Sequence, residues 1–226
     1  MVIIGALLTL RGITIEGPLA LLPYWASAAF LLGGAAYWFN LPVIFGKQPN
    51  GGHSPLSLLV MLPYLLTMRL VWRLRRALSS EDPFNEVSPG IYVGRRPLGD
   101  ELPGDVELVV DMTCEFAEGK RVLGGRGYMC LPTMDGSVPP DPEAFQQMIE
   151  KIVAFDGKIY IHCAYGHGRA AVVAAATLVG RGIAKDSNEA LEIMKGKRQG
   201  IRPNKHQNRW LRRVTRAKGS GSAPEI

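Results

Sequence analysis

Charged residues are distributed very unevenly along this chain of 226 residues. In the first 72 residues only four side chains carry a charge: Arg11, Glu16, Lys47 and Arg69. The remaining 154 residues therefore hold 23 of the 26 Lys and Arg and 19 of the 20 Asp and Glu. This contrast favours two regions in different solvents, a membrane region over residues 1–78 and a water-soluble domain over residues 79–218. The Gly- and Ser-rich residues 219–226 predict a flexible tail.

Two apolar segments in the first region are candidates for membrane spans. Residues 19–39 contain no formal charge, and residues 56–70 continue to Trp72 with one late arginine. A helix needs ~20 apolar residues to cross the hydrocarbon core of a bilayer, and the turn-rich residues 40–55 between the segments predict a loop. We expect two transmembrane helices, and a third if residues 2–15 also span rather than lie at the interface. The alternative is a pair of buried helices in a soluble protein.

A cluster of arginines at the end of the second apolar segment sets the expected orientation. Its members are Arg69, Arg73, Arg75 and Arg76. Positive charge beside a spanning helix marks the cytoplasmic side, so we expect a multi-pass integral membrane protein whose soluble domain is cytoplasmic. The three cysteines form no CxxC pair and no even-numbered framework, which also favours a reducing compartment for that domain.

In the soluble region, apolar runs typical of strands alternate with patterns typical of helices. Predicted strands cover residues 90–94, 107–112, 128–131 and 158–162. Predicted helices cover residues 142–155, 169–179, 188–194 and 205–218. Residues 79–89 are predicted to be a polar connector. Alternating strands and helices indicate an α/β fold with a mostly parallel central sheet flanked by helices.

The segment from Cys163 to Arg169 combines a nucleophile, small residues and the start of a helix. Its loop consists of Ala164, Tyr165, Gly166, His167 and Gly168. Unpaired N–H groups at a helix N-terminus attract anions, and the two glycines let the loop curl so that its N–H groups point at one phosphate. We expect the five loop residues to bind a substrate phosphate, while Arg169 contacts two of its oxygens with its planar fork. The same field stabilises a Cys163 thiolate as the nucleophile, and His162 supports the thiolate by anchoring the backbone behind the loop.

Cleavage of a phosphate ester also needs an acid that protonates the leaving group, and Asp135 is the candidate. It stands between a predicted strand and a predicted helix, in a Gly-, Ser- and Pro-containing segment that is able to close over a substrate. Asp141 is the rival, but its place before Pro142 favours a helix cap. Once a phosphocysteine has formed, Asp135 would act as the base for the attacking water. Gln207 is either a helix-surface side chain or a residue that orients this water.

These residues resemble a known signature. His162 and Cys163, five further residues and then Arg169 are similar to the signature of the cysteine-dependent protein tyrosine and dual-specificity phosphatases. Asp135, 28 residues before the cysteine, resembles the acid of the dual-specificity branch. The resemblance covers about residues 86–213 and implies hydrolysis of a phosphate monoester through a phosphocysteine, with no metal and no cofactor. The family usually has Ser or Thr directly after the arginine, where this sequence has Ala170.

The sequence leaves the substrate open between two classes of phosphorylated molecule. A membrane anchor favours a phospholipid head group, and a phosphotyrosine or phosphoserine protein at the membrane is the main alternative. Residues 195–218 contain ten Lys or Arg and no acid, which indicates either a solvated helix face or attraction to anionic membrane lipids. Nucleic-acid binding is not expected, because aromatic residues do not interleave with these charges. A function of another class is a non-catalytic phosphate-binding module, which only Ala170 favours.

Overall fold

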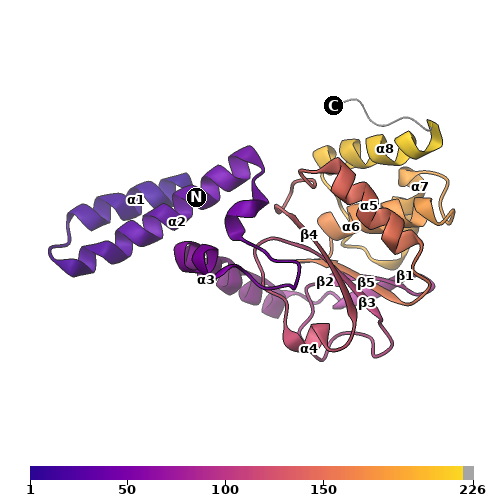
Figure 1. Cartoon of the computed structure of the whole chain (residues 1–226), viewed down its shortest axis with the longest axis horizontal. Helices are drawn as coiled ribbons and strands as arrows, with labels where there is room; N and C mark the ends of the chain where they lie inside the picture. The colour runs from indigo at the N-terminus through magenta and orange to yellow at the C-terminus, as the bar shows by residue number, and fades with distance from the viewer. Residues whose placement is uncertain (221–226) are drawn as a thin grey trace. The chain divides into compact units, whose positions relative to one another are not determined.

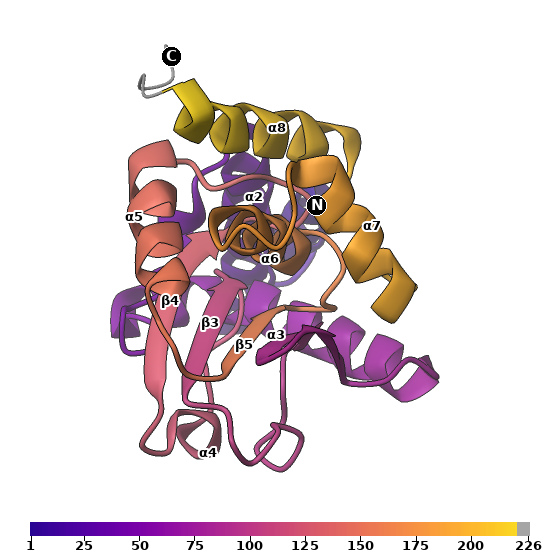
Figure 2. The same ribbon diagram turned by 90° about the vertical axis from the view of Figure 1, so that its right-hand side faces the viewer.

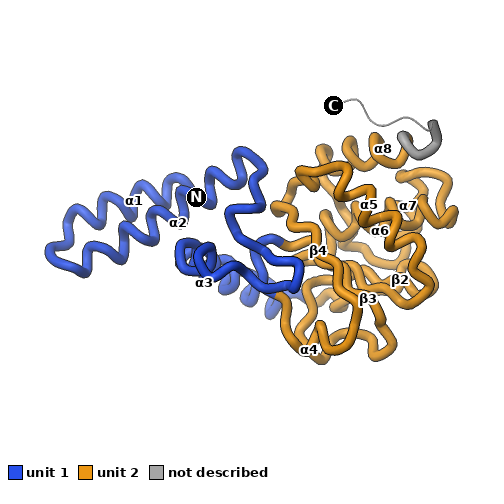
Figure 3. The backbone as a smooth tube through the Cα atoms, in the orientation of Figure 1, with its two compact units in different colours: residues 1–79, 114–117 blue, residues 80–113, 118–226 orange. Residues whose placement is uncertain are grey.

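The computed structural model describes residues 1–220, and the chain forms two compact units (Figure 3). The first unit comprises residues 1–79 and 114–117, and the second comprises residues 80–113 and 118–226. The apolar segments belong to the first unit, and the residues predicted to be catalytic belong to the second. Of the predicted tail, residues 219 and 220 are part of the last helix, and residues 221–226 lie outside the described residues.

The first unit consists of helices joined by short connections (Figure 1). Its elements are α1 (Val2–Ile13), the 3-10 helix η1 (Pro18–Ala20), α2 (Leu21–Phe39), the 3-10 helix η2 (Pro42–Phe45) and α3 (Pro55–Leu78). α2 ends at Asn40, which has the left-handed conformation (φ 51°) that Gly or Asn commonly adopts after a helix. α3 begins after Ser54, whose hydroxyl oxygen accepts the backbone N–H of Ser57. This hydrogen bond satisfies one of the unpaired donors of the first turn.

α1 and α2 pack closely because small residues line their contact. The hydroxyl of Ser27 donates to the carbonyl of Gly5 at 2.8 Å. A Cβ atom at Gly5 would lie 2.8 Å from the side chain of Leu31, and one at Gly12 would lie 2.7 Å from Tyr24. Larger residues at these two positions would therefore separate the helices, and small contact residues of this kind are typical of helix pairs in membranes.

Most of the surface of the two long apolar helices is exposed. The segments Pro18–Phe39 and Pro55–Leu78 are long and apolar enough to cross a membrane, and only 28% and 22% of their apolar stretches are buried. A core helix of a soluble protein is mostly buried, so this exposure disfavours the alternative of two core helices. α1 has 12 residues, a length of about 18 Å, and is shorter than the hydrocarbon core of ~30 Å.

The second unit is built on one five-stranded sheet. Its strands are β1 (Phe84–Ser88), β2 (Ile91–Arg95), β3 (Leu108–Thr113), β4 (Gly127–Thr133) and β5 (Ile159–Cys163). Their order is β1-β2-β5-β3-β4, with β1 antiparallel to β2 and the other neighbouring pairs parallel. The predicted α/β fold with a mostly parallel sheet is confirmed.

The edge strand β1 shows that the prediction for residues 79–89 is wrong in its second half. Val87 is the only buried residue of this strand, which pairs with β2 alone. A strand with one buried side chain lacks the alternation of apolar and polar residues that predicts a strand. The turn into β2 passes through Gly90, whose φ of 74° is rarely adopted by other residues.

Helices cover the two faces of this sheet unequally. They are α4 (Lys120–Leu123), α5 (Pro142–Val153), α6 (Arg169–Gly180), α7 (Ser187–Lys197) and α8 (Lys205–Ser220). Figure 2 shows α6 nearly end-on, with α5 and α7 to either side and α8 above it. These four helices share one large core with the sheet, whereas the opposite face carries the short α4 and a smaller cluster around Tyr160. Asp141 caps α5, as predicted, because its Oδ1 accepts the N–H groups of Glu143 and Ala144.

Candidate active site

The loop between β5 and α6 forms a cradle around the sulfur of Cys163. Cys163 is the buried last residue of β5, and Arg169 is the first residue of α6. The N–H of Gly166 donates to Cys163 Sγ at 3.3 Å. Gly166 has a φ of 75°, and a Cβ atom there would lie 2.4 Å from the carbonyl carbon of Gly94. Only glycine therefore fits where the loop curls back toward the sulfur.

The buried guanidinium of Arg169 joins this loop to a segment far away in the sequence. Its Nη1 donates to the carbonyl of Thr133 at 2.8 Å, and its Nη2 lies 3.2 Å from Asp135 Oδ1. β3, β4 and β5 run parallel, so their carboxyl ends meet at one edge of the sheet, where α/β folds usually bind ligands. The side chain of Asp135 is 50% exposed. The three residues predicted to be catalytic therefore lie together.

A cavity of about 250 Å³ opens at this edge of the sheet. Its lining consists of Asp135, Gly136, Cys163, Tyr165, His167, Gly168, Arg202, Asn204 and Gln207. Two loop residues predicted to bind phosphate, Ala164 and Gly166, are not part of this lining. Ala164 is buried, and its carbonyl accepts the N–H of Arg96 at 3.4 Å. Cys163 and Asp135 thus line the same open cavity, as a nucleophile and an acid would require.

Comparison with protein families assigns a family to the part of the chain that contains this site. Residues 105–217, half of the chain, match the family model described as dual specificity phosphatase, catalytic domain. The chain belongs to the dual-specificity phosphatase family. It is a cysteine-dependent phosphatase, and the matched residues contain Asp135, Cys163 and Arg169. A comparison with curated proteins finds no match.

Solved phosphatase structures share the fold at low sequence identity. PTPMT1 in complex with PI(5)P is 21% identical with a TM-score of 0.54, over 63% of this chain and 100% of that chain. Tk-PTP in its active form is 24% identical with a TM-score of 0.52, over 59% of this chain and 97% of that chain. A variant of human DUSP28 is 22% identical with a TM-score of 0.51, over 62% and 99% of the two chains. At these identities the likeness shows the fold.

Gln207 lies inside the phosphatase site and is not a helix-surface side chain. It is 2% exposed, its Nε2 donates to the carbonyl of Ser137 at 2.9 Å, and its Oε1 accepts the N–H of Asn204 at 3.0 Å. Asn204 in turn donates to the carbonyl of Gly136 at 2.6 Å and accepts the N–H of Gln207. The first turn of α8 therefore packs over the Asp135 loop, a contact between distant segments that no local pattern reveals.

Arg198 is a buried residue of the site that the sequence did not indicate. Its guanidinium donates to the loop carbonyls of Tyr165 at 3.2 Å and Gly166 at 3.3 Å, and to Asn85 Oδ1 at 2.8 Å. Burial lowers the pKa of Arg198, and the negative charge of Glu81 opposes this shift. Arg198 belongs to a run of basic residues that resembles a solvated helix face, so its burial has no sequence signal. The side chain supports the curled conformation of the phosphatase loop.

His167 of the loop contacts an acid at the start of the second unit. His167 Nε2 lies 2.6 Å from Glu81 Oε2, and Arg198 Nη2 lies 3.5 Å from the same oxygen. Burial opposes ionisation of Glu81, but the hydrogen bond and charge of His167, together with Arg198 and Arg202, keep its pKa below the usual value. These contacts attach the loop to the segment that precedes β1.

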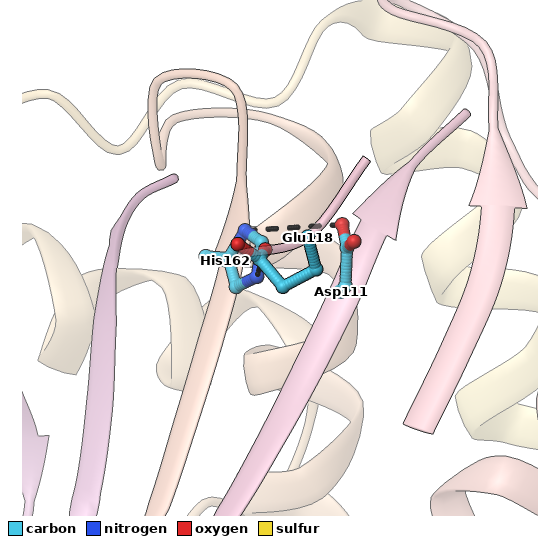
Figure 4. Close-up of side chains that lie close together, drawn as sticks. All are labelled: Asp111, Glu118 and His162. Carbon is cyan, nitrogen blue, oxygen red and sulfur yellow. Dashed lines mark ion pairs between the residues drawn. The ribbon is translucent and has the colours of Figure 1, made fainter. Parts of the chain in front are cut away.

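The imidazole of His162 is enclosed behind the loop by two buried carboxylates (Figure 4). Nε2 lies 3.2 Å from Glu118 Oε2, and Nδ1 lies 3.8 Å from Asp111 Oδ1. Asp111 also accepts the hydroxyl of Tyr128 at 2.8 Å. Burial, and then the charge of Asp111, raise the pKa of Tyr128, so its hydroxyl remains a donor. A carboxylate therefore lies on each side of the ring, although neither ring nitrogen forms a hydrogen bond within the described residues.

The spacing of this cluster also suits a metal ion, since its three ligand atoms lie within 4.8 Å of one another. The two carboxylates, however, face different nitrogens of the His162 ring, and a single ion would bind only one of the two nitrogens. Arg96 Nη2 already lies 3.4 Å from Glu118 Oε1. The cluster fits an anchored histidine beside Cys163 better than a metal centre.

Proposed function

We propose that this protein hydrolyses phosphate monoesters through a phosphocysteine at Cys163. The observation that carries the proposal is that Cys163 and Asp135 line one cavity, with the buried guanidinium of Arg169 3.2 Å from Asp135 Oδ1. The thiolate sulfur attacks phosphorus, an S–P bond forms, and the P–O bond to the leaving group breaks. Asp135 donates its carboxyl proton to the departing oxygen. A water molecule then attacks phosphorus and gives a proton to Asp135, which releases inorganic phosphate and the thiolate.

The contact between Arg169 and Asp135 supports an ordered cycle. A bound phosphate dianion competes with the Asp135 carboxylate for the same guanidinium, which lies 3.2 Å away, because Arg binds both anions through its fork. Substrate binding thus frees the Asp135 carboxylate, which takes up a proton from water and then serves as the acid for the leaving group. Gln207, whose side chain lines the cavity, orients the water of the second step.

For the substrate, we propose a phosphorylated lipid head group. Two apolar helices with largely exposed surfaces would place the enzyme in a bilayer, and the structurally similar PTPMT1 was solved with PI(5)P. The loop residues 164–168 contain no lysine, and Arg202 is the one Lys or Arg in the cavity lining, so a singly phosphorylated head group suits the site better than a multiply phosphorylated one. A phosphotyrosine or phosphoserine protein is the alternative substrate.

We further propose that α2 and α3 span the membrane with the phosphatase domain in the cytoplasm. Arg73, Arg75 and Arg76 in the last turns of α3 mark that side. Reporter fusions at residue 50 and at the C-terminus test this topology. Cytoplasmic signal from both sites would exclude it.

The decisive experiment measures phosphate release by the detergent-purified chain, with Cys163→Ala as the control. Phosphatidylglycerophosphate and a phosphotyrosine peptide are offered in parallel. Turnover of the lipid supports the proposal, and turnover of the peptide alone selects the alternative substrate. A single burst of the dephosphorylated product equal to the enzyme concentration, with no release of inorganic phosphate, would indicate that Ala170 leaves the phosphocysteine trapped.

A further inference from the structure

The outer face of α8 carries a continuous stripe of positive charge. The stripe consists of Lys205, Arg209, Arg212, Arg213 and Arg216, and all five residues are exposed. Their spacing of three to four residues places them on one side of a helix. With Asn208 they line an open groove of about 690 Å³. The stripe is about 17 Å long, at 1.5 Å per helical residue.

The helix that carries the stripe is held firmly by its other face. Leu211 is fully buried, Val214 is nearly so, and both belong to the core shared with α6. In Figure 1, α8 lies over α6 on the side away from the strands. The orientation of the five cations is therefore set by the packing of the domain.

Among the described residues, these charges form no ion pair with an acid. Residues 195–218 contain no acid. The acid that interacts with the stripe is Asp186, whose pKa is lowered mainly by backbone N–H groups at the start of α7 and least by the charge of Arg212. Five neighbouring cations repel one another, so an extended anionic surface is the complementary partner.

The stripe begins beside the phosphatase cavity. Asn204 and Gln207, at the start of α8, line that cavity, and Lys205 and Asn208 at the same end of the helix line the groove. An anionic surface that contacts the stripe would thus lie next to the opening above Cys163.

We propose that the α8 stripe docks on the anionic surface of a lipid bilayer and holds the cavity at the level of the phosphorylated head groups. This inference rests on the proposed lipid substrate. Nucleic acid is a poorer partner, because Trp210, the only Trp, Tyr or Phe in residues 205–220, is half-buried and packs edge-on against Phe145. The apolar helices of the same chain bring lipid within reach. Each basic residue near such a surface strengthens the attraction by about fivefold.

The test uses the full chain in nanodiscs of phosphatidylcholine alone or with phosphatidylserine. In wild type, phosphatidylserine should raise kcat/KM for phosphatidylglycerophosphate. The variant R209Q/R212Q/R216Q should lose this increase and hydrolyse the lipid on the order of a hundredfold more slowly, with unchanged hydrolysis of a soluble aryl phosphate. The variant R209K/R212K/R216K should behave like wild type. A glutamine variant that still responds to phosphatidylserine, or a lysine variant that does not, would overturn the proposal.

A second measurement separates this proposal from the choice of substrate. Phenylglyoxal modifies accessible arginines, and mass spectrometry reports each site. Phosphatidylserine should protect Arg209, Arg212 and Arg216, whereas Arg121 on α4, with 82% of its side chain exposed, should react equally in both nanodiscs. Protection without lipid hydrolysis would refute the lipid substrate and retain the docking surface. If each of the four arginines reacted equally in nanodiscs with and without phosphatidylserine, the docking surface would be refuted whatever the substrate.

Discussion

The helices α2 and α6 are both rich in apolar residues, yet their surroundings are opposite. In α6 the ten residues from Arg169 to Leu178 are all buried, because the sheet, α5, α7 and α8 enclose this helix. In α2 only five of 19 residues are buried. Large side chains such as Trp38 and Phe39 are exposed. Apolar composition alone therefore does not distinguish a helix in a protein core from a helix whose apolar surface is exposed.

Side-chain size separates the two helices more clearly than hydropathy does. Residues 170–176 of α6 are all Ala or Val, so the backbone can lie close to the sheet and to three other helices. In the first unit, glycines lie where two helices approach closely: Gly5 and Gly12 of α1 face Leu31 and Tyr24 of α2, and Gly33 of α2 faces Tyr64 of α3. Small residues thus mark the surfaces where a helix backbone approaches protein, in either region.

The strongest test of this contrast places the same charge in both helices. Val173→Asp puts an unpaired carboxylate in the core of the second unit, where Val173 is fully buried. We expect loss of the folded domain, since such a charge costs about as much as the whole stability of a domain, ~5–15 kcal/mol. Circular dichroism melting and hydrolysis of an aryl phosphate measure the effect.

Leu32→Asp is the matched change on α2, where Leu32 is 39% exposed. If α2 spans a bilayer, this charge costs ~2.5–3.5 kcal/mol of insertion but leaves aryl phosphate hydrolysis intact. Carbonate extraction of membranes reports the fraction inserted. An unchanged membrane fraction for Leu32→Asp would contradict the spanning role of α2.

A second test compares the two ends of α6 with the same substitution. Arg169→Lys removes the planar fork at the first residue, and kcat/KM should fall ~10²–10³-fold, as for loss of a donor to a developing charge. Arg181→Lys at the other end changes an arginine that donates to the carbonyls of Ile152 and Phe155. It should leave kcat/KM unchanged. Equal losses from both variants would mean that Arg169 acts through stability alone.

Arg198→Met tests whether a buried cation supports the loop. The carbonyls of Tyr165 and Gly166 lose a donor, and each unsatisfied buried group costs ~1–3 kcal/mol. We expect a lower midpoint of urea unfolding and a reduced kcat, because the curled loop loosens around Cys163. Arg198→Lys should recover part of both, since it restores one donor. A stable variant with wild-type kcat would show that Arg198 is dispensable.

Helix caps should matter more in the water-exposed region than in α2. Asp141 caps α5 through two backbone N–H groups, whereas no side-chain hydrogen bond caps α2. Asp141→Ala should lower the free energy of unfolding by ~1 kcal/mol, with activity unchanged. Asp186→Ala, at the equivalent cap of α7, is the control and should behave alike. Loss of activity in Asp141→Ala alone would reinstate this residue as the acid.

The smallest effect concerns the contact of Glu81 with the loop. The pKa of Glu81 is lowered below the ordinary value of 4.5. Its ionised carboxylate therefore stabilises the folded domain fully above pH 4.5, and this contribution is lost as the pH falls through the lowered pKa. Wild type should therefore be more stable than Glu81→Gln at neutral pH, and the difference should vanish in acid. The difference in melting temperature between the two proteins, measured against pH, tests this. A constant difference would exclude the ion pair as its cause.

Most regular elements of the second unit were predictable because their signals are local. The strands β2, β3 and β5 and the helices α5 to α8 follow apolar patterns within single segments. β1, at the edge of the sheet, and the four-residue α4 carry too few buried residues for such a pattern. The Cys163 loop was predictable for the same reason, since nucleophile, glycines and Arg169 lie within seven consecutive residues.

The sequence by itself determined the division of the chain by charge, the parallel α/β character of the soluble part and the signature of its phosphatase loop. Each of these depends on residues that are neighbours along the chain, so composition and spacing were sufficient. Only the tertiary structure decided that Arg169 meets Asp135, that Arg198 and Gln207 are buried in the site, and that His162 lies between two carboxylates. The burial and pairing of a polar side chain depend on contacts between segments that are distant in the sequence. These contacts form only in the folded domain, so local sequence patterns do not predict them.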